Sequence, residues 1–132
     1  MFETIEIRST KRIELIDITD KVNSIIVRTN IKEGVCFLNV PHTTAGITIN
    51  ENADSDVVYD ILAKTNKLVP VNDNYAHTEG NSDSHIKSSL FGQTLSVIIE
   101  NNRALLGRWQ SVYFCEFDGP RNRKVYIKIF GG

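Results

Sequence analysis

The sequence predicts an α+β fold, in which largely antiparallel or mixed β-sheet layers are covered by two to three helices. Segments with the pattern of strands outnumber those with the pattern of helices, and several of them are neighbours along the chain. The length of 132 residues fits one compact domain over residues 1–132. A (β/α)8 barrel would need about 250 residues. The glycine pattern of a doubly wound nucleotide-binding fold is absent.

Alternation of apolar and polar residues predicts the first two strands, Phe2–Arg8 and Arg12–Ile18. The run Val35–Val40 is apolar throughout, which predicts a strand covered on both faces. A short strand is expected at Ile47–Glu51. Three more strands are expected near the end of the chain, at Thr94–Glu100, Gln110–Phe117 and Lys124–Phe130.

Apolar residues at helical spacing predict two amphipathic helices and a third, short one. The first should cover Thr19–Val27, with Thr19 as its N-cap. The second should begin near Asp54, whose charge suits the positive end of a helix. Its buried stripe is expected to consist of Val57, Val58, Ile61 and Leu62. The third helix should run from Ser82 or Asp83 to Phe91 and end at Gly92.

Composition and cysteine usage favour a cytoplasmic protein that binds neither nucleic acid nor membranes. The net charge of −1 argues against a dedicated nucleic-acid binder. There is no apolar run of about 18 residues, as a membrane span requires, and the N-terminus does not resemble a signal peptide. Cys36 and Cys115 lie in apolar, strand-like runs without CxxC spacing. We therefore expect two buried free thiols in a reducing compartment.

The three histidines fall in polar clusters at the ends of predicted elements, where side chains from different strands can converge. His42 follows an apolar strand, His77 precedes a Glu-Gly-Asn turn, and His85 lies in the first turns of the short helix. Three histidines are suited to be the protein ligands of a catalytic zinc site. There is no HExxH spacing, so a loop and a helix would have to combine. The alternative is that each histidine makes only local hydrogen bonds.

Two carboxylates in these clusters are candidates for catalysis. Glu79 or Glu116 could act as a general base or orient a ligating histidine. Glu116 ends an apolar strand, where a buried charge would need a partner. Asp54, by contrast, is explained by its position as a helix N-cap.

Hydroxyl, backbone and guanidinium groups in the same clusters could bind an anion. The Gly-Asn-Ser turn leads into a helix N-terminus, whose free N–H groups attract phosphate or carboxylate. An arginine after the Asp-Gly-Pro turn could bind a phosphate with two hydrogen bonds. That turn is also explained as a tight connection between the last two strands, and both interpretations are compatible. The candidates are Thr43, Thr44, Gly80, Asn81, Ser82 and Arg121.

Three motifs carry a resemblance: HTTAGITINENAD (42–54), HTEGNSDSHIKSSLFGQ (77–93) and GRWQSVYFCEFDGPR (107–121). Together they resemble the YjbQ family, also called UPF0047 or the secondary thiamine-phosphate synthase family, over nearly the whole chain. The resemblance implies a single YjbQ-like α+β domain and a homotrimer with polar pockets between subunits. It also implies a metal held by His42, His77 and His85. The chain has Ser82 and Ser84 where many members have alanine, and Gln93 where serine is common, so no proposed ligand is lost.

The residues and the resemblance together favour a small-metabolite enzyme with a three-histidine metal site and a phosphate-binding pocket at a trimer interface. The resemblance implies weak thiamine-phosphate synthase activity, in which a diphosphate leaves and anion-binding groups neutralise its charge. Histidines favour zinc or another transition metal, whereas diphosphate chemistry usually uses magnesium. One alternative is a metal-dependent hydrolase of a small phosphorylated metabolite, with Glu79 or Glu116 as base. Another is a non-catalytic trimer that binds a metal or metabolite, and Trp109 is a candidate interface residue.

Overall fold

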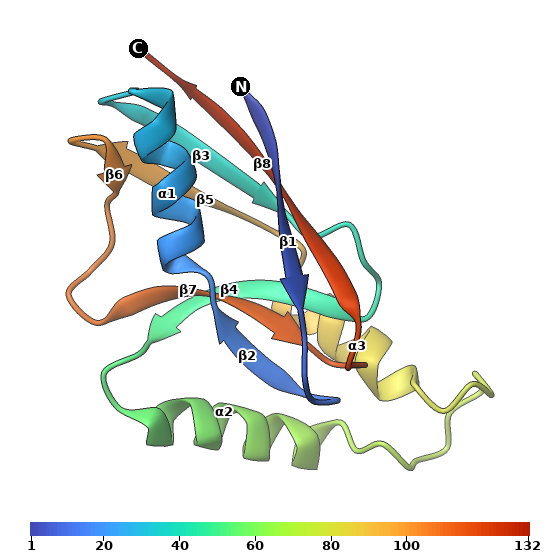
Figure 1. Cartoon of the computed structure of the whole chain (residues 1–132). Coiled ribbons are helices and arrows are strands. Elements are labelled where there is room, and N and C mark those ends of the chain that lie inside the picture. Colours follow the sequence, from blue (N-terminus) through green and yellow to red (C-terminus); the bar gives the residue numbers. More distant parts are fainter.

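Strands and helices follow one another in the order that the sequence patterns predict, with one additional short strand (Figure 1). The computed structural model describes all 132 residues and confirms the α+β class. The strands are β1 (Phe2–Arg8), β2 (Glu14–Asp17), β3 (Gly34–Asn39), β4 (Ala45–Glu51), β5 (Thr94–Glu100), β6 (Arg103–Ala104), β7 (Gln110–Glu116) and β8 (Asn122–Gly131), and the helices are α1 (Thr19–Thr29), α2 (Ser55–Leu68) and α3 (Ser82–Phe91).

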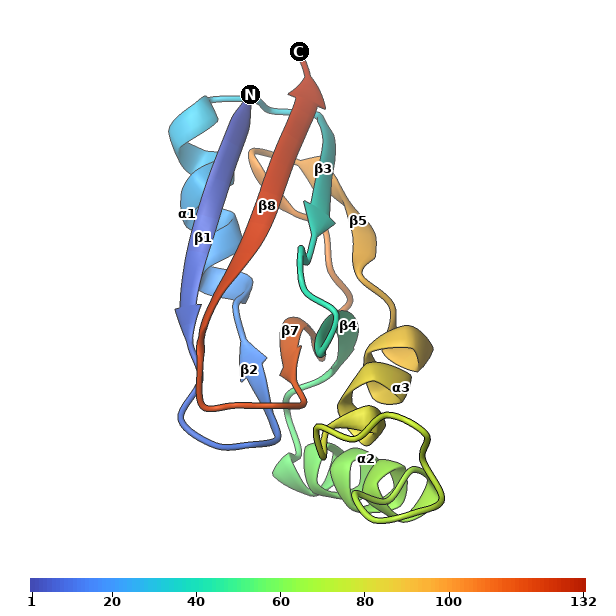
Figure 2. The ribbon, with the colours of Figure 1, turned by 90° about the vertical axis from the view of Figure 1, so that its right-hand side faces the viewer.

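The strands form two sheets, and every strand pair is antiparallel. The larger sheet has the order β1-β8-β3-β5-β6, and the smaller one has the order β2-β7-β4. Helix α1 contacts β6 of the larger sheet and β7 of the smaller one, whereas α3 contacts β4. Figure 2 shows α2 and α3 gathered at the lower end of the molecule, below the larger sheet. The loops at this end are therefore close to both sheets.

The hydrophobic core lies on the inward faces of the larger sheet and of α1. Strand β8 alternates strictly between exposed and buried residues from Asn122 to Phe130, as expected when one face of a strand packs on the core. Helix α1 buries Val22, Ile25 and Ile26, which share one side of the helix. These residues belong to one cluster of 18 buried apolar side chains that also includes members of β4 and β7.

Several details of the predicted elements differ in the structure. The predicted strand Arg12–Ile18 is shorter, since β2 covers only Glu14–Asp17. Thr19 is the first residue of α1 and not its N-cap, because its backbone N–H donates to Asp17 Oδ1 (2.9 Å) and its Oγ1 accepts from the Val112 N–H (2.9 Å). Strand β3 is covered on one face only, since Phe37 is 47% exposed. No helix lies over that outer face (Figure 2), and the Phe37 ring packs edge-on against Phe130, with 6.0 Å between the centroids.

Helix α2 is less buried than its pattern predicts. Asp54 is its N-cap, as expected, and accepts a hydrogen bond from the Asp56 N–H (2.9 Å). However, no residue of the helix is buried, because α2 lies at the lower edge of the molecule (Figure 1). Tyr59 is 71% exposed and Leu68 is 70% exposed. The predicted stripe is only half-buried at Val57, Val58, Ile61 and Leu62.

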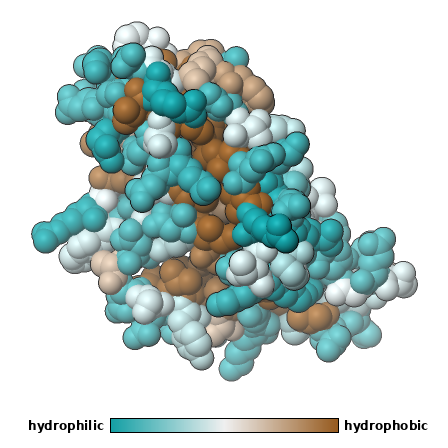
Figure 3. All heavy atoms as spheres, viewed as in Figure 1, coloured by the Kyte–Doolittle hydropathy of each residue, from teal (hydrophilic) through white to brown (hydrophobic).

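A hydrophobic band also reaches the surface between α1 and β1 and continues toward β2, with hydrophilic residues on either side (Figure 3). In β2, Leu15 and Ile16 are half-buried. Part of the apolar interior is therefore left open at this side of the chain.

The two cysteines are buried free thiols, as the sequence predicts. Burial raises the pKa of the Cys36 thiol to about 11, and it raises the pKa of Cys115 as well. Both side chains therefore act as small apolar core residues. None of the three helices is long and apolar enough to cross a membrane.

Candidate functional site

Three polar segments meet at one end of the two sheets and enclose a pocket of about 390 Å³. They are the β3–β4 connection, the segment that leads into α3, and the β7–β8 turn, which lie on the right-hand side of Figure 1. No residue of the pocket wall is hydrophobic. The chain thus brings together side chains from all three sequence motifs. Seven of the predicted site residues line the pocket: His42, Thr43, Thr44, Glu79, Asn81, His85 and Arg121.

The other four predicted site residues lie outside this wall. His77 and Ser82 line an adjoining pocket of about 340 Å³, which shares His85 with the first. Gly80 has a φ of 82°, a left-handed conformation that glycine adopts without strain, and it shapes the turn before α3. Glu116 is fully buried. Of the Gly-Asn-Ser turn that was predicted to bind an anion, only Asn81 therefore lines this pocket.

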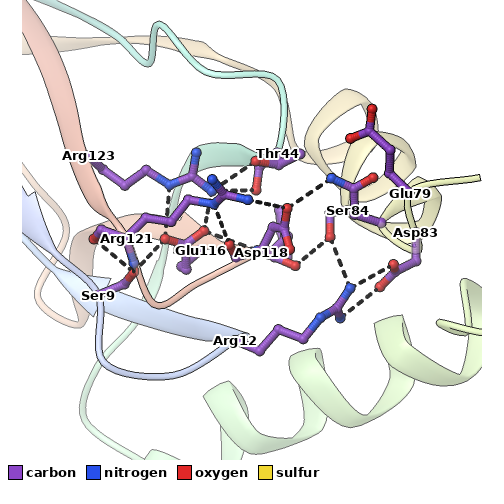
Figure 4. A network of polar contacts seen from close by, with 12 residues as sticks. Ser9, Arg12, Thr44, Glu79, Asp83, Ser84, Glu116, Asp118, Arg121 and Arg123 are labelled. Atoms are coloured by element: carbon purple, nitrogen blue, oxygen red, sulfur yellow. Dashed lines mark hydrogen bonds and ion pairs between the residues drawn. The ribbon is translucent and has the colours of Figure 1, made fainter.

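Asp118, which the sequence analysis did not single out, fixes Arg121 at the pocket rim. The Arg121 guanidinium donates to the Asp118 carbonyl (Nε, 2.7 Å) and to Asp118 Oδ2 (Nη2, 2.9 Å). The same carboxylate oxygen accepts from Asn81 Nδ2 (2.9 Å), so it joins the β7–β8 turn to the start of α3 (Figure 4). Arg121 Nη1 has no partner in the chain and is available to a ligand.

A buried ion pair between Arg123 and Glu116 adjoins this network (Figure 4). Arg123 Nε donates to Glu116 Oε1 (2.9 Å), and Nη2 donates to Glu116 Oε2 and to Thr44 Oγ1 (2.9 Å). Glu116 also accepts from the Ser9 hydroxyl (2.5 Å) and from the Asp118 N–H (3.1 Å). The two side chains are 5% and 0% exposed. This pair couples β8 to β7 and to the β3–β4 connection.

The environment of Glu116 favours a positioning role over the predicted role of catalytic base. Burial by itself raises the pKa of Glu116, but hydrogen bonds from Arg123, Ser9 and the Asp118 N–H outweigh it, so the pKa lies below its usual range. A general base needs a pKa near the working pH and access to the substrate proton. Glu116 has neither, and of the two predicted carboxylates only Glu79 reaches the pocket.

His42 is a neutral imidazole whose tautomer is fixed by one hydrogen bond. Its Nε2 accepts the backbone N–H of Lys124 (2.9 Å), so this nitrogen carries no proton and the proton resides on Nδ1. Burial and the charge of Arg123 lower the pKa of His42, with Glu116 opposing the effect in part. The imidazole is therefore held in one tautomer by the β8 backbone.

His77 and His85 lie against each other, with 5.4 Å between their ring centroids and an interplanar angle of 90°. His77 Nε2 is 3.1 Å from Asn81 Oδ1. The amide nitrogen of Asn81 donates to Asp118, so its oxygen faces His77 and accepts a hydrogen bond from His77 Nε2. His77 Nε2 also lies 3.9 Å from Glu79 Oε2. The ring of His85 makes no hydrogen bond within the chain, in contrast to the other two histidine rings. It stands between the two pockets and is free to contact a ligand.

The donor groups of one chain do not fit a three-histidine metal centre. No group of three or more His, Cys, Asp or Glu side chains is arranged to hold a metal ion. His42 Nε2 is already engaged with the Lys124 N–H, and its Nδ1 carries the proton. Ligands from a second copy of the chain would be needed to complete a centre around His77 and His85.

Helix α3, which carries His85, is fixed by charges that the sequence analysis did not identify. Arg12 donates twice to the buried Asp83 (3.0 and 3.2 Å), and the fully buried Lys87 donates to the same carboxylate (3.1 Å) and to Asn66 Oδ1 (2.8 Å). Hydrogen bonds to Arg12 and Lys87 keep the pKa of Asp83 below its usual range, although burial alone would raise it. Asp83 thereby connects α3 to the β1–β2 loop, and Lys87 connects it to α2.

The sequence contains a pattern that indicates a buried position for Arg123. The alternation that places every second residue of β8 in the core extends back to position 123, so a charged residue falls on the buried face. A buried arginine requires an acidic partner, and Glu116 is a charged residue at the end of an apolar strand. The pair was therefore detectable. Asp118 lies in a connecting segment without such a pattern, and Arg12 lies before β2, although alternation predicted it as the first residue of that strand.

The chain resembles proteins of one family over its full length. The sequence model of the family described as UPF0047 protein YjbQ-like matches residues 3–132. A UPF0047 protein of Methanocaldococcus jannaschii is 52% identical over 96% of this chain and 91% of its own. The UPF0047 protein YugU of Bacillus subtilis is 50% identical over 99% of this chain and 100% of its own.

Solved structures show the same fold. A crystal structure of a YjbQ/UPF0047 family protein from Clostridium acetobutylicum is 47% identical, with a TM-score of 0.94 over 97% of this chain and 99% of that chain. A YbjQ-like protein of unknown function from Sulfolobus solfataricus is 30% identical, with a TM-score of 0.94 over 100% and 97%. The chain therefore belongs to the YjbQ-like UPF0047 family.

Proposed function

We propose that the pocket binds the phosphate group of a small metabolite and that the protein is an enzyme acting on that metabolite. The observation that carries the proposal is the wholly polar pocket wall, to which three separate segments contribute. Arg121 Nη1, His42 Nδ1–H and the Thr43 hydroxyl are donors at this wall, and several donors converging on one point suit a phosphate group. Glu79 adds a carboxylate whose side chain is 74% exposed.

The reaction that the family resemblance favours is the formation of thiamine phosphate from two phosphorylated precursors, as a weak activity. A diphosphate leaves from the attacked carbon, and negative charge grows on the leaving group. Arg121 and His42 both line the pocket, and each has an N–H group without a partner in the chain, which supports hydrogen bonding to such a group. Since His42 donates as a neutral imidazole, the charge neutralisation rests on the arginine.

A hydrolase is the second candidate, and the position of Glu79 favours it. Glu79 Oε2 lies 3.9 Å from His77 Nε2, so a carboxylate and an imidazole stand together beside the pocket. Such a pair can orient and deprotonate a water molecule for attack on a phosphoester. The third candidate, a non-catalytic metabolite-binding protein, needs only the pocket.

We further propose that the pocket is completed in a homotrimer. The half-buried apolar stripe of α2, the hydrophobic band between α1 and β1, and Trp109, which is 56% exposed, support an assembly that covers apolar surface. A reducing cytoplasm is supported by the two buried free thiols. Light scattering on a size-exclusion column should give three times the monomer mass, and a monomer at micromolar concentration would contradict the assembly.

The metal stays a prediction, and no step of the proposed reaction depends on it. Zinc, another transition metal or magnesium would have to be held by residues of more than one chain. Elemental analysis of protein purified without a histidine tag tests it directly. A His85→Ala variant that retains the same metal content as the wild type would exclude His85 as a ligand.

Binding and turnover test the proposed function separately. Inorganic phosphate titrated into the wild-type protein should bind, and Arg121→Ala should weaken the binding. The two thiamine precursors and a panel of phosphoesters then distinguish synthase from hydrolase. Glu79→Gln should lower the rate of hydrolysis with little change in phosphate binding. Absence of phosphate binding by the wild type would refute the proposal, whereas binding without turnover would support the non-catalytic candidate.

A further inference from the structure

We infer that Arg123, held in place by Glu116, is a second anchor for the bound phosphate and forms the floor of the pocket. The inference rests on the proposed function and assigns to the same site a residue that the sequence analysis did not select. Arg123 is one of the ten residues of the pocket wall although its side chain is only 5% exposed.

The hydrogen bonds of Arg123 leave one nitrogen free. Its Nε–H and the two N–H groups of Nη2 are directed at Glu116 and Thr44. Nη1, with its two N–H groups, has no partner in the chain. No buried side-chain nitrogen or oxygen lacks a partner, so Nη1 must be accessible from outside.

The contacts of Arg123 place its guanidinium beside the pocket wall. The side chain of Arg123 turns from β8 toward Thr44 and Glu116 (Figure 4), and Thr44 itself belongs to the pocket wall.

Glu116 acts here as a positioning residue. A guanidinium bound on two sides cannot rotate, so its remaining N–H groups keep a fixed direction before a ligand arrives. A site that is already oriented loses little side-chain entropy on binding, unlike a flexible surface lysine. The side chain of Arg121 is 53% exposed and is held only by Asp118, so it is less tightly fixed than that of Arg123. It lies at the entrance of the same site. The two arginines are therefore expected to contact different oxygens of one phosphate.

The test uses the full-length wild-type protein labelled with 15N-arginine and titrated with inorganic phosphate. The guanidinium resonances of Arg123 should shift and saturate at the same phosphate concentration as those of Arg121. The Arg123→Lys variant keeps the charge but loses the free Nη1, and it should bind phosphate about ten- to a hundredfold more weakly. Arg28→Lys is the matched control, because Arg28 is exposed and pairs with Glu3 on another face.

The outcomes separate the inference from the proposed function. Phosphate binding in which the Arg121 signals respond but those of Arg123 do not would overturn the inference and leave the proposed function standing. Unchanged affinity of a folded Arg123→Lys variant would do the same. If that variant does not fold, the wild-type titration alone decides. No phosphate binding by the wild type would refute both.

Discussion

Arg123 on β8 and Glu116 on β7 form a buried ion pair across the turn that carries Arg121. Glu116 accepts four hydrogen bonds, from Arg123 twice, from the Ser9 hydroxyl and from the Asp118 N–H. The pair thus joins the ends of both sheets at the pocket. Because neither charge has another strong partner of opposite sign, removal of either one leaves a buried charge without compensation.

The first prediction concerns the stability that this pair maintains. Glu116→Gln should lower the free energy of unfolding at pH 7 by about 3–5 kcal/mol, because Arg123 remains buried and unpaired. The measurement is equilibrium unfolding in urea. Glu3→Gln is the control, since Glu3 pairs with the exposed Arg28, and its loss should cost less than about 1 kcal/mol. Equal effects of the two substitutions would contradict a special role for the buried pair.

The same carboxylate predicts a pH dependence. The pKa of Glu116 in the folded protein lies below its usual value of 4.5, so the folded state binds this proton less readily than the unfolded state. The resulting stabilisation is fully present above about pH 4.5 and is lost as the pH falls through the lower folded-state pKa. The difference in unfolding free energy between wild type and Glu116→Gln should therefore shrink on acidification below pH 4.5. A difference that stays constant from pH 7 to pH 3 would show that Glu116 does not titrate in this way.

A third prediction concerns the rim of the pocket. Arg121→Lys should weaken the binding of inorganic phosphate about tenfold, because lysine cannot keep both hydrogen bonds to Asp118 and still offer a free N–H pair. The unfolding free energy should change by less than about 1 kcal/mol, since Arg121 is on the surface. Calorimetric titration measures the first effect and urea unfolding the second. A large loss of stability with unchanged binding would assign Arg121 to the fold and not to the site.

The fourth prediction compares two members of the charge cluster that fixes α3. Asp83→Asn should destabilise the protein more than Lys87→Met, because Asp83 neutralises both Arg12 and Lys87. The first change leaves two cations without a carboxylate and should cost about 3 kcal/mol or more. The second leaves Asp83 still bound by Arg12 with two hydrogen bonds, and methionine fills a similar volume. Equilibrium unfolding in urea measures the loss of stability in each variant. A larger loss for Lys87→Met than for Asp83→Asn would contradict the view that Asp83 neutralises both cations.

Much of the fold follows from local patterns in the sequence. The limits of β1 and β5 and the end of α3 agree with the predicted ones to the residue, because period-two alternation and Gly92 are local signals. The half-exposed α2 and the open outer face of β3 were not predictable in the same way. An apolar stripe shows which side of a helix prefers to be covered, but it does not show whether the chain itself supplies the cover.

Seven of the predicted site residues line one pocket, whereas Asp118 and Arg123 and the arrangement of the pocket were not predicted. The three motifs do converge, because His42, Glu79 and Arg121 each follow the end of an element at the same end of the sheets. The separation of His77 from His42 and the engagement of His42 Nε2 by Lys124 depend on how β8 passes the β3–β4 connection. No spacing along the chain encodes that approach.

The sequence by itself determined the α+β class, the order of the elements, the family and the three polar segments that supply the pocket. These follow from side-chain periodicity and from the residue types at the ends of elements, which are local properties. Tertiary structure alone decided the roles within the pocket. It placed Glu116 beneath the wall as the partner of Arg123, fixed the tautomer of His42, and left Arg121 and Arg123 each with a free nitrogen. Burial and hydrogen-bond partners set these roles, and both depend on contacts between residues that are distant in the chain.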